Sequence, residues 1–411
     1  MNTWKLSWSG LRTVTELEIK QRIRSKRWIW ALVGWVVLLG TITMLVMLAA
    51  RSMYSVGYDD GAVVAGAGPT VFAAITYLVL GMGLVIAPAF TATAINGDRS
   101  AGTLATLQAT RLSAVEIAAG KLSAAWLTAT VFLVAAVPFI ALSMAWGDIS
   151  LAQVVVVFLV VLTEVAVVCA IGLGWSAVIS RPAGSAMLTY LSVVFLTVIT
   201  LVAFALSIVL VMVRQPVQVW GLPPDVVAEY GRQVDDYFEK NPDKDNPPPA
   251  PVEKCTWFEE ERQVTYTDQI WWLLLANPFI IVSDAAPLPE GAAQNLADYN
   301  QRGVDPMASL RYQVRRLSDP PELRIDECSQ YYDGQPGYLV TYDDQGNAQV
   351  TTKNGVPVQV SPVQRPVVNV ETPVWPGGLA FHLLLGAVFF WVAVRRLRVP
   401  YRSLRAGTRV A

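Results

Sequence analysis

The sequence contains few charged residues for its length and a single histidine. Charged side chains make up 15% of the 411 residues, whereas an ordinary soluble domain carries about 25%. One histidine and three cysteines argue against a zinc site and against a histidine-based catalytic triad. The low charge also argues against a purely soluble enzyme, a disordered protein or a nucleic-acid-binding domain.

Long hydrophobic runs are abundant instead. Hydrophobic residues make up 54% of the chain, and the mean hydropathy is +0.42. A helix needs about 20 mostly apolar residues to cross a bilayer, and six runs qualify. They are Trp28–Leu48, Val71–Ile95, Leu122–Trp146, Leu151–Ile179, Ala186–Val213 and Trp375–Val394. The first run is too long and too far from the N-terminus for a cleaved signal peptide, so we expect an all-α membrane protein with six spans.

The charge distribution predicts the orientation of these spans. Basic residues crowd segment 1–27, before the first span, and segment 395–411, after the last one. By the positive-inside rule both ends are cytoplasmic, and the loop 214–374 then lies outside. This loop holds 13 basic and 24 acidic residues, a net charge of −11, while the rest of the chain carries +10. The excess of 23 Arg over 8 Lys suggests a GC-rich bacterial genome, so we expect a bacterial plasma membrane protein.

The segment 214–374 is long enough to form its own small domain. From Pro224 onwards the spacing predicts an amphipathic helix, and the residues on its apolar face are Val226, Val227, Tyr230, Val234, Tyr237 and Phe238. Asp305-Pro306 resembles a helix N-cap, and residues 338–342 and 348–352 are typical of strands. We therefore expect a small α+β extracytoplasmic domain between spans five and six.

Two further features lie within this loop. Cys255 and Cys328 would be outside the cytoplasm, where two thiols in one domain usually form a disulfide; two separate buried thiols are the alternative. Residues 271–282 are an apolar island that is too short to span, and Asn277-Pro278 should break a helix in its middle. The island is either a re-entrant segment or the core of the external domain.

The loop after span two carries an unusual pattern over residues 96–112. We expect Thr103 to cap a short cytoplasmic helix that begins at Leu104, with Leu107 on the same apolar edge. Ser113 and Glu116 have the spacing of a capping box that opens the next helix. A surface helix with a small apolar edge can fit a cleft on another protein. The alternative is an ordinary polar connector, which is the commoner structure for such a loop.

This pattern resembles the signature of type-2 ATP-binding-cassette (ABC) transporter permeases. The matching residues are Asp98, Gly102, Thr103, Leu104, Leu107, Gly120 and Lys121. Residues 18–28 resemble the basic connecting helix of that family, and the six-span order also agrees. The sequence differs at Asp98, where the family more often has Glu, and at Arg111, where it often has Pro. The resemblance does not cover most of 214–374.

The resemblance implies a six-helix permease bundle coupled to a separate ATPase subunit. The coupling contact would be formed by Gly102, Thr103, Leu104 and Leu107, with Asp98 and Arg99 as polar anchors. A dimer of ATPases would bind ATP and Mg, and a second permease, identical or related, would complete the pathway. The chain itself carries no cofactor, because Gly120-Lys121 is followed by Leu122 and position 115 is Val, which fails the phosphate-binding loop pattern.

Polar residues within the spans are candidates for a substrate pathway. Glu164 lies midway along span four, where insertion of an ionisable side chain costs free energy and therefore suggests a function. A structural, hydrogen-bonded Glu is the alternative. The other candidates are Tyr77, Tyr190, Ser192 and Thr197, and each can instead bond to a neighbouring helix.

Two functions from different classes fit these observations. The first is a permease subunit that exports an amphipathic or lipid-like substrate by alternating access in contact with membrane lipid. The second is an ATPase-linked membrane scaffold whose acidic external domain binds an extracytoplasmic protein. The large external loop favours keeping the second hypothesis. Neither hypothesis involves nucleic acid.

Overall fold

The computed structural model describes residues 6–23, 26–54, 68–110, 112–145, 149–243, 247–248, 250–287, 305–328, 338–342, 348–352, 357–358 and 372–398. The predicted basic tail therefore lies mostly outside the described residues. The chain divides into two compact units. The membrane unit comprises Met1–Ala205, Trp271–Arg316 and Val370–Ala411, and the second unit comprises Leu206–Ile270 and Leu317–Asn369.

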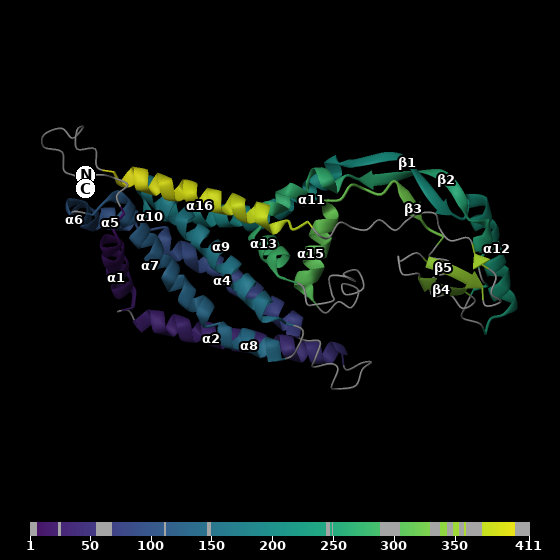
Figure 1. The fold of residues 1–411 in the computed structure, drawn as a ribbon, viewed down its shortest axis with the longest axis horizontal. Helices are drawn as coiled ribbons and strands as arrows, with labels where there is room; N and C mark the ends of the chain where they lie inside the picture. Colours follow the sequence, from purple (N-terminus) through teal and green to yellow (C-terminus); the bar gives the residue numbers. More distant parts are fainter. Residues whose placement is uncertain are drawn as a thin grey trace. The chain divides into compact units, whose positions relative to one another are not determined.

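Within the described residues, six helices are long and apolar enough to cross a membrane (Figure 1), which confirms the predicted architecture. Four of these spans are formed by single helices, which are α2 (Lys26–Tyr54), α4 (Gly68–Thr91), α9 (Leu151–Val178) and α16 (Trp375–Leu397). The third span consists of α7 (Ala114–Val134) and α8 (Val137–Ala145). The fifth span consists of α10 (Pro182–Val194), the π-helical turn η1 (Phe195–Ile199) and α11 (Thr200–Leu210).

Several predicted boundaries differ from the structure by a few residues, and two of these differences have a clear local cause. The third span begins at Ala114 rather than Leu122, because Ser113 and Glu116 form the expected capping box and start the helix early. The fifth span was expected to run to Val213, but α11 ends at Leu210 and the strand β1 begins at Met212. The β-branched residues Val211 and Val213 suit a strand as well as a membrane helix, so hydropathy alone does not separate the two.

The helix α9 is the centre of the membrane unit. It packs against α4, α7, α10 and α16, and most of its residues from Val160 to Ala177 are buried. The absence of a side chain at Gly174 permits a close contact with α16, since a Cβ atom there would lie 2.5 Å from Cδ1 of Phe389. The long, evenly apolar sequence of α9 is therefore explained by burial on several sides.

The apolar island belongs to the membrane unit. It forms a 3-10 turn η4 (Trp271–Ala276) and a short helix α13 (Pro278–Ala285), which packs against α9 and α16. As expected, Asn277-Pro278 divides the island, and the Asn277 side chain accepts a hydrogen bond from the Phe279 amide. This grouping favours the re-entrant alternative over a core of the second unit.

The helix α15 (Pro306–Leu317) follows in the same unit. The carboxylate of Asp305 accepts hydrogen bonds from the amides of Met307 and Ala308, which confirms the predicted N-cap. Residues 271–316 of the predicted external segment 214–374 thus group with the membrane helices.

The second unit is built on a three-stranded sheet in the order β2-β1-β3. The strand β1 (Met212–Gly221) pairs antiparallel with β2 (Thr256–Thr265) and parallel with β3 (Arg324–Asp326). Val217 and Val219 alternate with more exposed neighbours, as a half-buried strand requires. The predicted strands β4 (Tyr338–Tyr342) and β5 (Ala348–Thr352) are confirmed, and with β6 (Pro357–Val358) they form a separate sheet.

A disulfide closes the small core of this unit. Cys255 and Cys328 are bonded, with 6.3 Å between their Cα atoms, which confirms the predicted pairing. Around them lie Trp220, Leu222, Ala250 and Val252, together with Val226 and Tyr230 of α12 (Pro224–Lys240). The predicted amphipathic helix is therefore present, although Val227 is 41% exposed rather than part of the packed face.

Candidate coupling site

A pair of short helices connects span two to span three. They are α5 (Asn96–Ser100) and α6 (Thr103–Ala109), and Ala101 and Gly102 separate them. Gly102 has φ +74°, a left-handed conformation that glycine adopts without steric cost. Gly102 is also the N-cap of α6, so the expectation that Thr103 caps this helix is wrong. Thr103 is the first helical residue, and its hydroxyl donates to the Asp98 carbonyl at 3.2 Å.

The apolar edge of α6 faces the chain's own helices. Leu104 is 4% exposed and belongs to a buried cluster with Ile95, Val115 and Ile117. Leu107 is half-buried and packs against the same cluster. These two leucines therefore hold α6 onto the membrane bundle, while Gly102 and Thr103 at the start of the helix are exposed.

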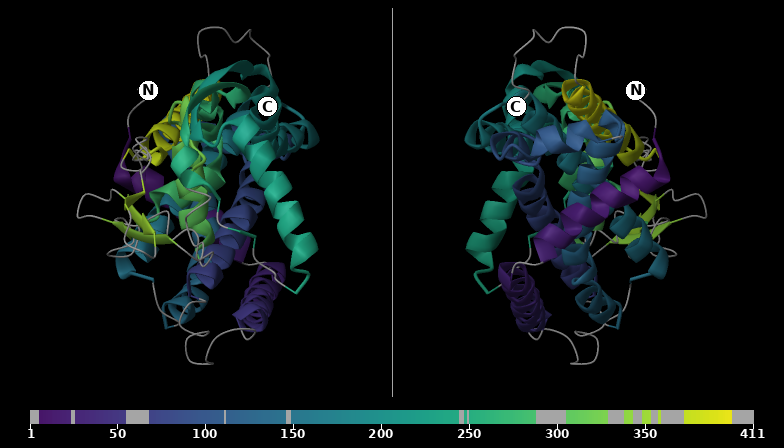
Figure 2. Two further views of the ribbon diagram at one scale, coloured as in Figure 1. Left: turned by 90° about the vertical axis from the view of Figure 1, so that its right-hand side faces the viewer. Right: turned by 90° about the vertical axis from the view of Figure 1, so that its left-hand side faces the viewer.

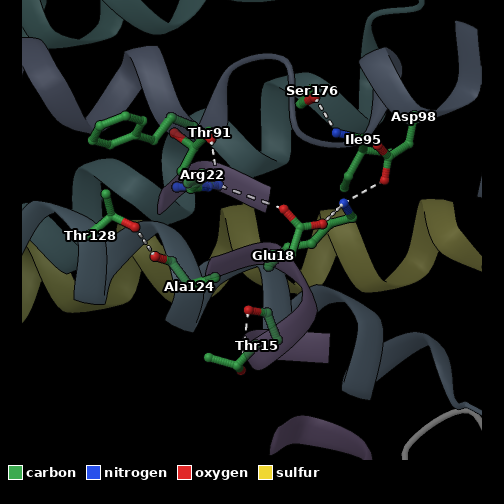
Figure 3. Close-up of polar contacts among 12 residues, drawn as sticks. Thr15, Glu18, Arg22, Thr91, Ile95, Asp98, Ala124, Thr128 and Ser176 are labelled. Atoms are coloured by element: carbon green, nitrogen blue, oxygen red, sulfur yellow. Dashed lines mark hydrogen bonds and ion pairs between the residues drawn. The ribbon is translucent and has the colours of Figure 1, made fainter. Parts of the chain in front are cut away.

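Lys121 is the centre of the site. Its Nζ atom lies 2.5 Å from Oε1 of Glu18 and 2.5 Å from Oδ2 of Asp98 (Figure 3). Glu18 belongs to α1 (Trp8–Ile23), Asp98 to α5 and Lys121 to α7. The Lys121 side chain is 1% exposed, compared with 12% for Glu18 and 29% for Asp98. A buried ammonium needs such partners, because an unpaired charge there would be strongly unfavourable.

Two further contacts dock α1 onto the bundle beside this ion triad. Thr15 on α1 donates to the carbonyl of Gly120 at 3.4 Å, and a Cβ atom on Gly120 would lie 2.5 Å from Cβ of Val14. Arg22 donates to the carbonyl of Phe90 at 3.2 Å and lies 5.2 Å above the Phe90 ring. Burial lowers the pKa of Arg22, and the charge of Glu18 opposes this shift.

The beginning of α1 is fixed by the capping box of α7. Glu116 accepts hydrogen bonds from the amide of Ser113 at 2.7 Å and from the amide and hydroxyl of Ser7 at 2.8 and 2.5 Å. The carboxylate that caps α7 thus also binds the residue that precedes α1. A single side chain sets the position of both helices.

Residues 96–112, named the coupling segment after the role expected for them, are bound on their other side to α9. The hydroxyl of Ser176 accepts hydrogen bonds from the amides of Ile95 and Asn96, and the Asn96 side chain donates to the carbonyl of Ile179. The coupling segment is therefore attached to α1, α7 and α9 at once, and a displacement of α6 would act on all three helices.

A second set of buried charges binds the re-entrant segment to span six. Asp284 of α13 accepts a hydrogen bond from Nε of Arg315 at 2.6 Å, and its second oxygen accepts from the amides of Val374 and Trp375 at 2.7 and 2.8 Å. Asp284 and Arg315 are 1% and 2% exposed. The carboxylate of Asp284 caps the start of α16, where the helix dipole favours negative charge.

Glu164 makes a third buried contact of this kind. Its Oε2 atom lies 2.6 Å from Nδ1 of His382 on α16, and Nε2 of the same ring lies 3.0 Å from the carbonyl of Ala276. Both side chains are 1% exposed. This geometry favours the structural alternative for Glu164, since it binds α9, α16 and the re-entrant segment to one another.

The remaining pathway candidates are each bonded to a different neighbour. Tyr77 is 2.7 Å from the Ser283 hydroxyl, and Tyr190 donates to the Val85 carbonyl at 3.2 Å. Ser192 accepts from the Trp175 indole at 3.0 Å, and Thr197 donates to the Val193 carbonyl at 2.8 Å. The structure therefore does not bring these residues together into one polar site, and their role in transport stays a prediction.

The sequence reasoning missed several residues of these networks. Glu18, Glu116 and Ser7 were not singled out for these contacts, nor were Asp284, Arg315 and His382. Glu18 lies 103 positions from Lys121, and Asp284 lies 31 positions from Arg315; a single sequence contains no signal that pairs residues so far apart. Among the described residues no group of three or more His, Cys, Asp or Glu could hold a metal ion.

Six spans, a short helix pair bound to the N-terminal helix α1, and an apolar segment packed against the last span define a polytopic membrane protein. The model of the ABC-2 family transporter proteins matches residues 12–281, and the chain belongs to this family. It is thus the membrane-spanning permease subunit of an ABC transporter, whose ATPase is a separate subunit. No curated protein matches the chain.

Proposed function

We propose that this permease subunit exports an amphipathic or lipid-like substrate by alternating access. The observation that supports this most directly is the ion triad of Glu18, Asp98 and Lys121, which joins the coupling segment to α1 and α7. A rigid joint of this kind would transmit movement of the coupling segment to the membrane helices. Bistable packed elements, rather than soft ones, carry such conformational changes over long distances.

The residues of the coupling segment divide into two roles in this mechanism. Gly102 and Thr103 are exposed and would contact the ATPase subunit, with Arg99 beside them. Leu104 and Leu107 would fix α6 to the bundle, and Asp98 would pass the displacement to Lys121. ATP and Mg would bind to a dimer of the ATPase subunits and not to this chain.

Six spans would form half of the pathway, so a second permease of the same or a related kind would supply the other half. The pathway would run between the two halves, with Tyr77, Tyr190, Ser192 and Thr197 as candidate lining residues. Glu164 would act through His382 on the re-entrant segment instead of contacting substrate. The charge distribution supports cytoplasmic termini in a bacterial plasma membrane.

The test is purification of the chain from its native membrane in mild detergent, followed by mass spectrometry of the bound subunits. An ATPase subunit and a second permease copy or relative should remain bound, and the complex should hydrolyse ATP. Reconstitution into vesicles then allows candidate lipids to be screened for stimulation of ATP hydrolysis. Absence of any ATPase under conditions that preserve other membrane complexes would contradict the proposal.

A second function is favoured by the folded unit that carries the Cys255–Cys328 disulfide and its own core. This unit would bind an extracytoplasmic protein, and ATP hydrolysis would then drive assembly or signalling. Because residues 271–316 group with the membrane unit, deletion of the whole loop is a poor test. The Cys255→Ala, Cys328→Ala double variant loosens only the second unit. A transporter would keep its substrate-stimulated ATP hydrolysis, whereas a scaffold would lose its bound partner.

A further inference from the structure

An apolar groove lies between the N-terminal helix α1 and the beginning of α7. Its volume is about 700 Å³, and its lining comprises Trp8, Leu11, Arg12, Thr15, Glu16, Ile19, Lys20, Ser123, Trp126 and Leu127. The right-hand view of Figure 2 shows α1, in purple near the N-terminus, running across the membrane helices. Apart from Thr15, which also donates to the carbonyl of Gly120, these residues take no part in the networks described around Lys121, Asp284 and Glu164.

The groove follows from the way in which the two helices cross. They approach most closely at Val14 and Gly120, where a Cβ atom on the glycine would lie 2.5 Å from Cβ of Val14. Beside this crossing, Ser123, Trp126 and Leu127 of α7 face the side of α1 that carries Leu11 and Ile19. The indole of Trp126 donates its hydrogen bond to the Leu162 carbonyl at 2.9 Å, so the polar atom of this ring is satisfied within the protein.

The chemistry of the lining is that of a membrane interface. Trp8 is 82% exposed and Leu127 is 42% exposed, and large exposed apolar side chains of this kind are favourable next to lipid. The lining also contains two cations, Arg12 and Lys20, and one anion, Glu16. Lys20 pairs with Glu16 at 2.7 Å, and its hydrogen bond, followed by its charge, lowers the pKa of Glu16. The Arg12 guanidinium therefore supplies the net positive charge of the groove.

We propose that this groove binds one anionic phospholipid, with an acyl chain along the apolar lining and the phosphate at Arg12. An apolar groove with one surplus cation at its edge complements this ligand, because the acyl chain contacts the apolar lining while the phosphate pairs with the cation. Ser123, Trp126 and Leu127, which form the α7 side of the groove, belong to the third candidate span, so we expect its open side to face the lipid leaflet. A bound lipid would fill the space between α1 and α7 and brace α1 against the helix that carries Lys121.

The test is native mass spectrometry of the purified complex, titrated with dioleoyl phosphatidylglycerol or with the zwitterionic dioleoyl phosphatidylcholine. The wild-type protein should retain one phosphatidylglycerol molecule per permease chain more strongly than phosphatidylcholine. Arg12→Gln should weaken the retention about fivefold, as expected for one basic side chain at a membrane surface. Glu16→Gln should strengthen it, because it removes the only anion from the lining.

Two matched controls separate the groove from general effects. Ser123→Trp fills the groove and should abolish the preference for phosphatidylglycerol, whereas Val131→Phe adds a ring to an exposed position of α7 outside the groove and should not. Arg396→Gln removes a charge from the exposed end of α16 and should leave the preference unchanged.

Four results would overturn the proposal. Equal retention of the two lipids would remove the role of Arg12, and full retention by Ser123→Trp would place the lipid elsewhere. Conversion of a permease dimer into monomers by Ser123→Trp, with unchanged lipid binding, would make the groove a surface between two copies of the chain. A change in the same direction for Arg12→Gln and Glu16→Gln would indicate a folding effect instead of a charge effect.

Discussion

Nζ of Lys121 lies 2.5 Å from Oδ2 of Asp98, at the junction between the coupling segment and the third membrane helix. Asp98 is partly exposed, whereas Lys121 is buried. The pair therefore connects a residue at the surface with the interior of the bundle. Glu18 binds the same ammonium from α1, so the joint includes the N-terminal helix as well.

We predict that Lys121→Met destabilises the membrane unit by about 3 kcal/mol, because it removes the cation that Glu18 and Asp98 share. Glu18 keeps its weaker contact with Arg22 at 3.8 Å. Asp98→Asn should also destabilise it, while Asp98→Glu keeps the charge and should remain closer to the wild-type protein. Lys240→Met, at an exposed position of α12, is the control and should have little effect. The free energy of unfolding in detergent checks these values, and wild-type stability of Lys121→Met would refute the structural role of the triad.

The crossing of α1 and α7 predicts a contrast between two glycines. Gly120→Ala should cost about 1–3 kcal/mol, because its methyl group would collide with Val14. Gly34→Ala, on α2, meets no atom within 4 Å and should be neutral or stabilising by up to about 1 kcal/mol, since alanine favours helix. Both values come from the same unfolding titration. Equal effects of the two substitutions would show that α1 does not pack on Gly120.

The re-entrant segment should depend on Asp284. Asp284→Asn removes the counter-charge of Arg315 and weakens the cap of α16, so we expect a loss of about 3–5 kcal/mol. Asp235→Asn on the exposed face of α12 is the matched control. Proteolysis of the segment around residues 271–287 should also become faster in the Asp284 variant. An unchanged cleavage rate together with unchanged stability would contradict the proposed bond to span six.

The disulfide should stabilise the second unit alone. Its loop spans 73 positions, and in the chain-entropy model a loop of this length contributes about 4 kcal/mol. The Cys255→Ala, Cys328→Ala variant should therefore unfold this unit at lower denaturant concentration and leave the membrane unit unchanged. Cys169→Ala alters the free, buried cysteine of α9 and should not affect the second unit. A shift of both units in the double variant would show that they unfold together.

The sequence predicted those parts of the fold that depend on residues close together in the chain. Spans appear as apolar runs, and the strands 338–342 and 348–352 appear as short β-branched segments. The capping box at Ser113 and Glu116 is also local, so it could be recognised from three-residue spacing. The family signature pointed to Asp98 and Lys121 without showing that they form an ion pair.

The contacts between distant elements could not be predicted in this way. The family signature named Lys121 but did not predict its burial, because its partner Glu18 comes from a helix 103 positions away. Leu104 was expected at the coupling contact, but it packs inward, since Ile95 and Ile117 offer a buried surface. The strand β1 was partly assigned to span five, because its valines are as apolar as those of a membrane helix.

The most direct test of the permease mechanism is site-specific photo-crosslinking of the purified transporter at Thr103. A benzoyl-phenylalanine placed at this exposed position of α6 should form an adduct with the ATPase subunit, and the adduct should depend on bound nucleotide. The same group placed at Thr256, an exposed residue of β2 in the second unit, should form none. An ATPase adduct from Thr256 but not from Thr103 would contradict both the coupling role of residues 96–112 and the proposed orientation in the membrane.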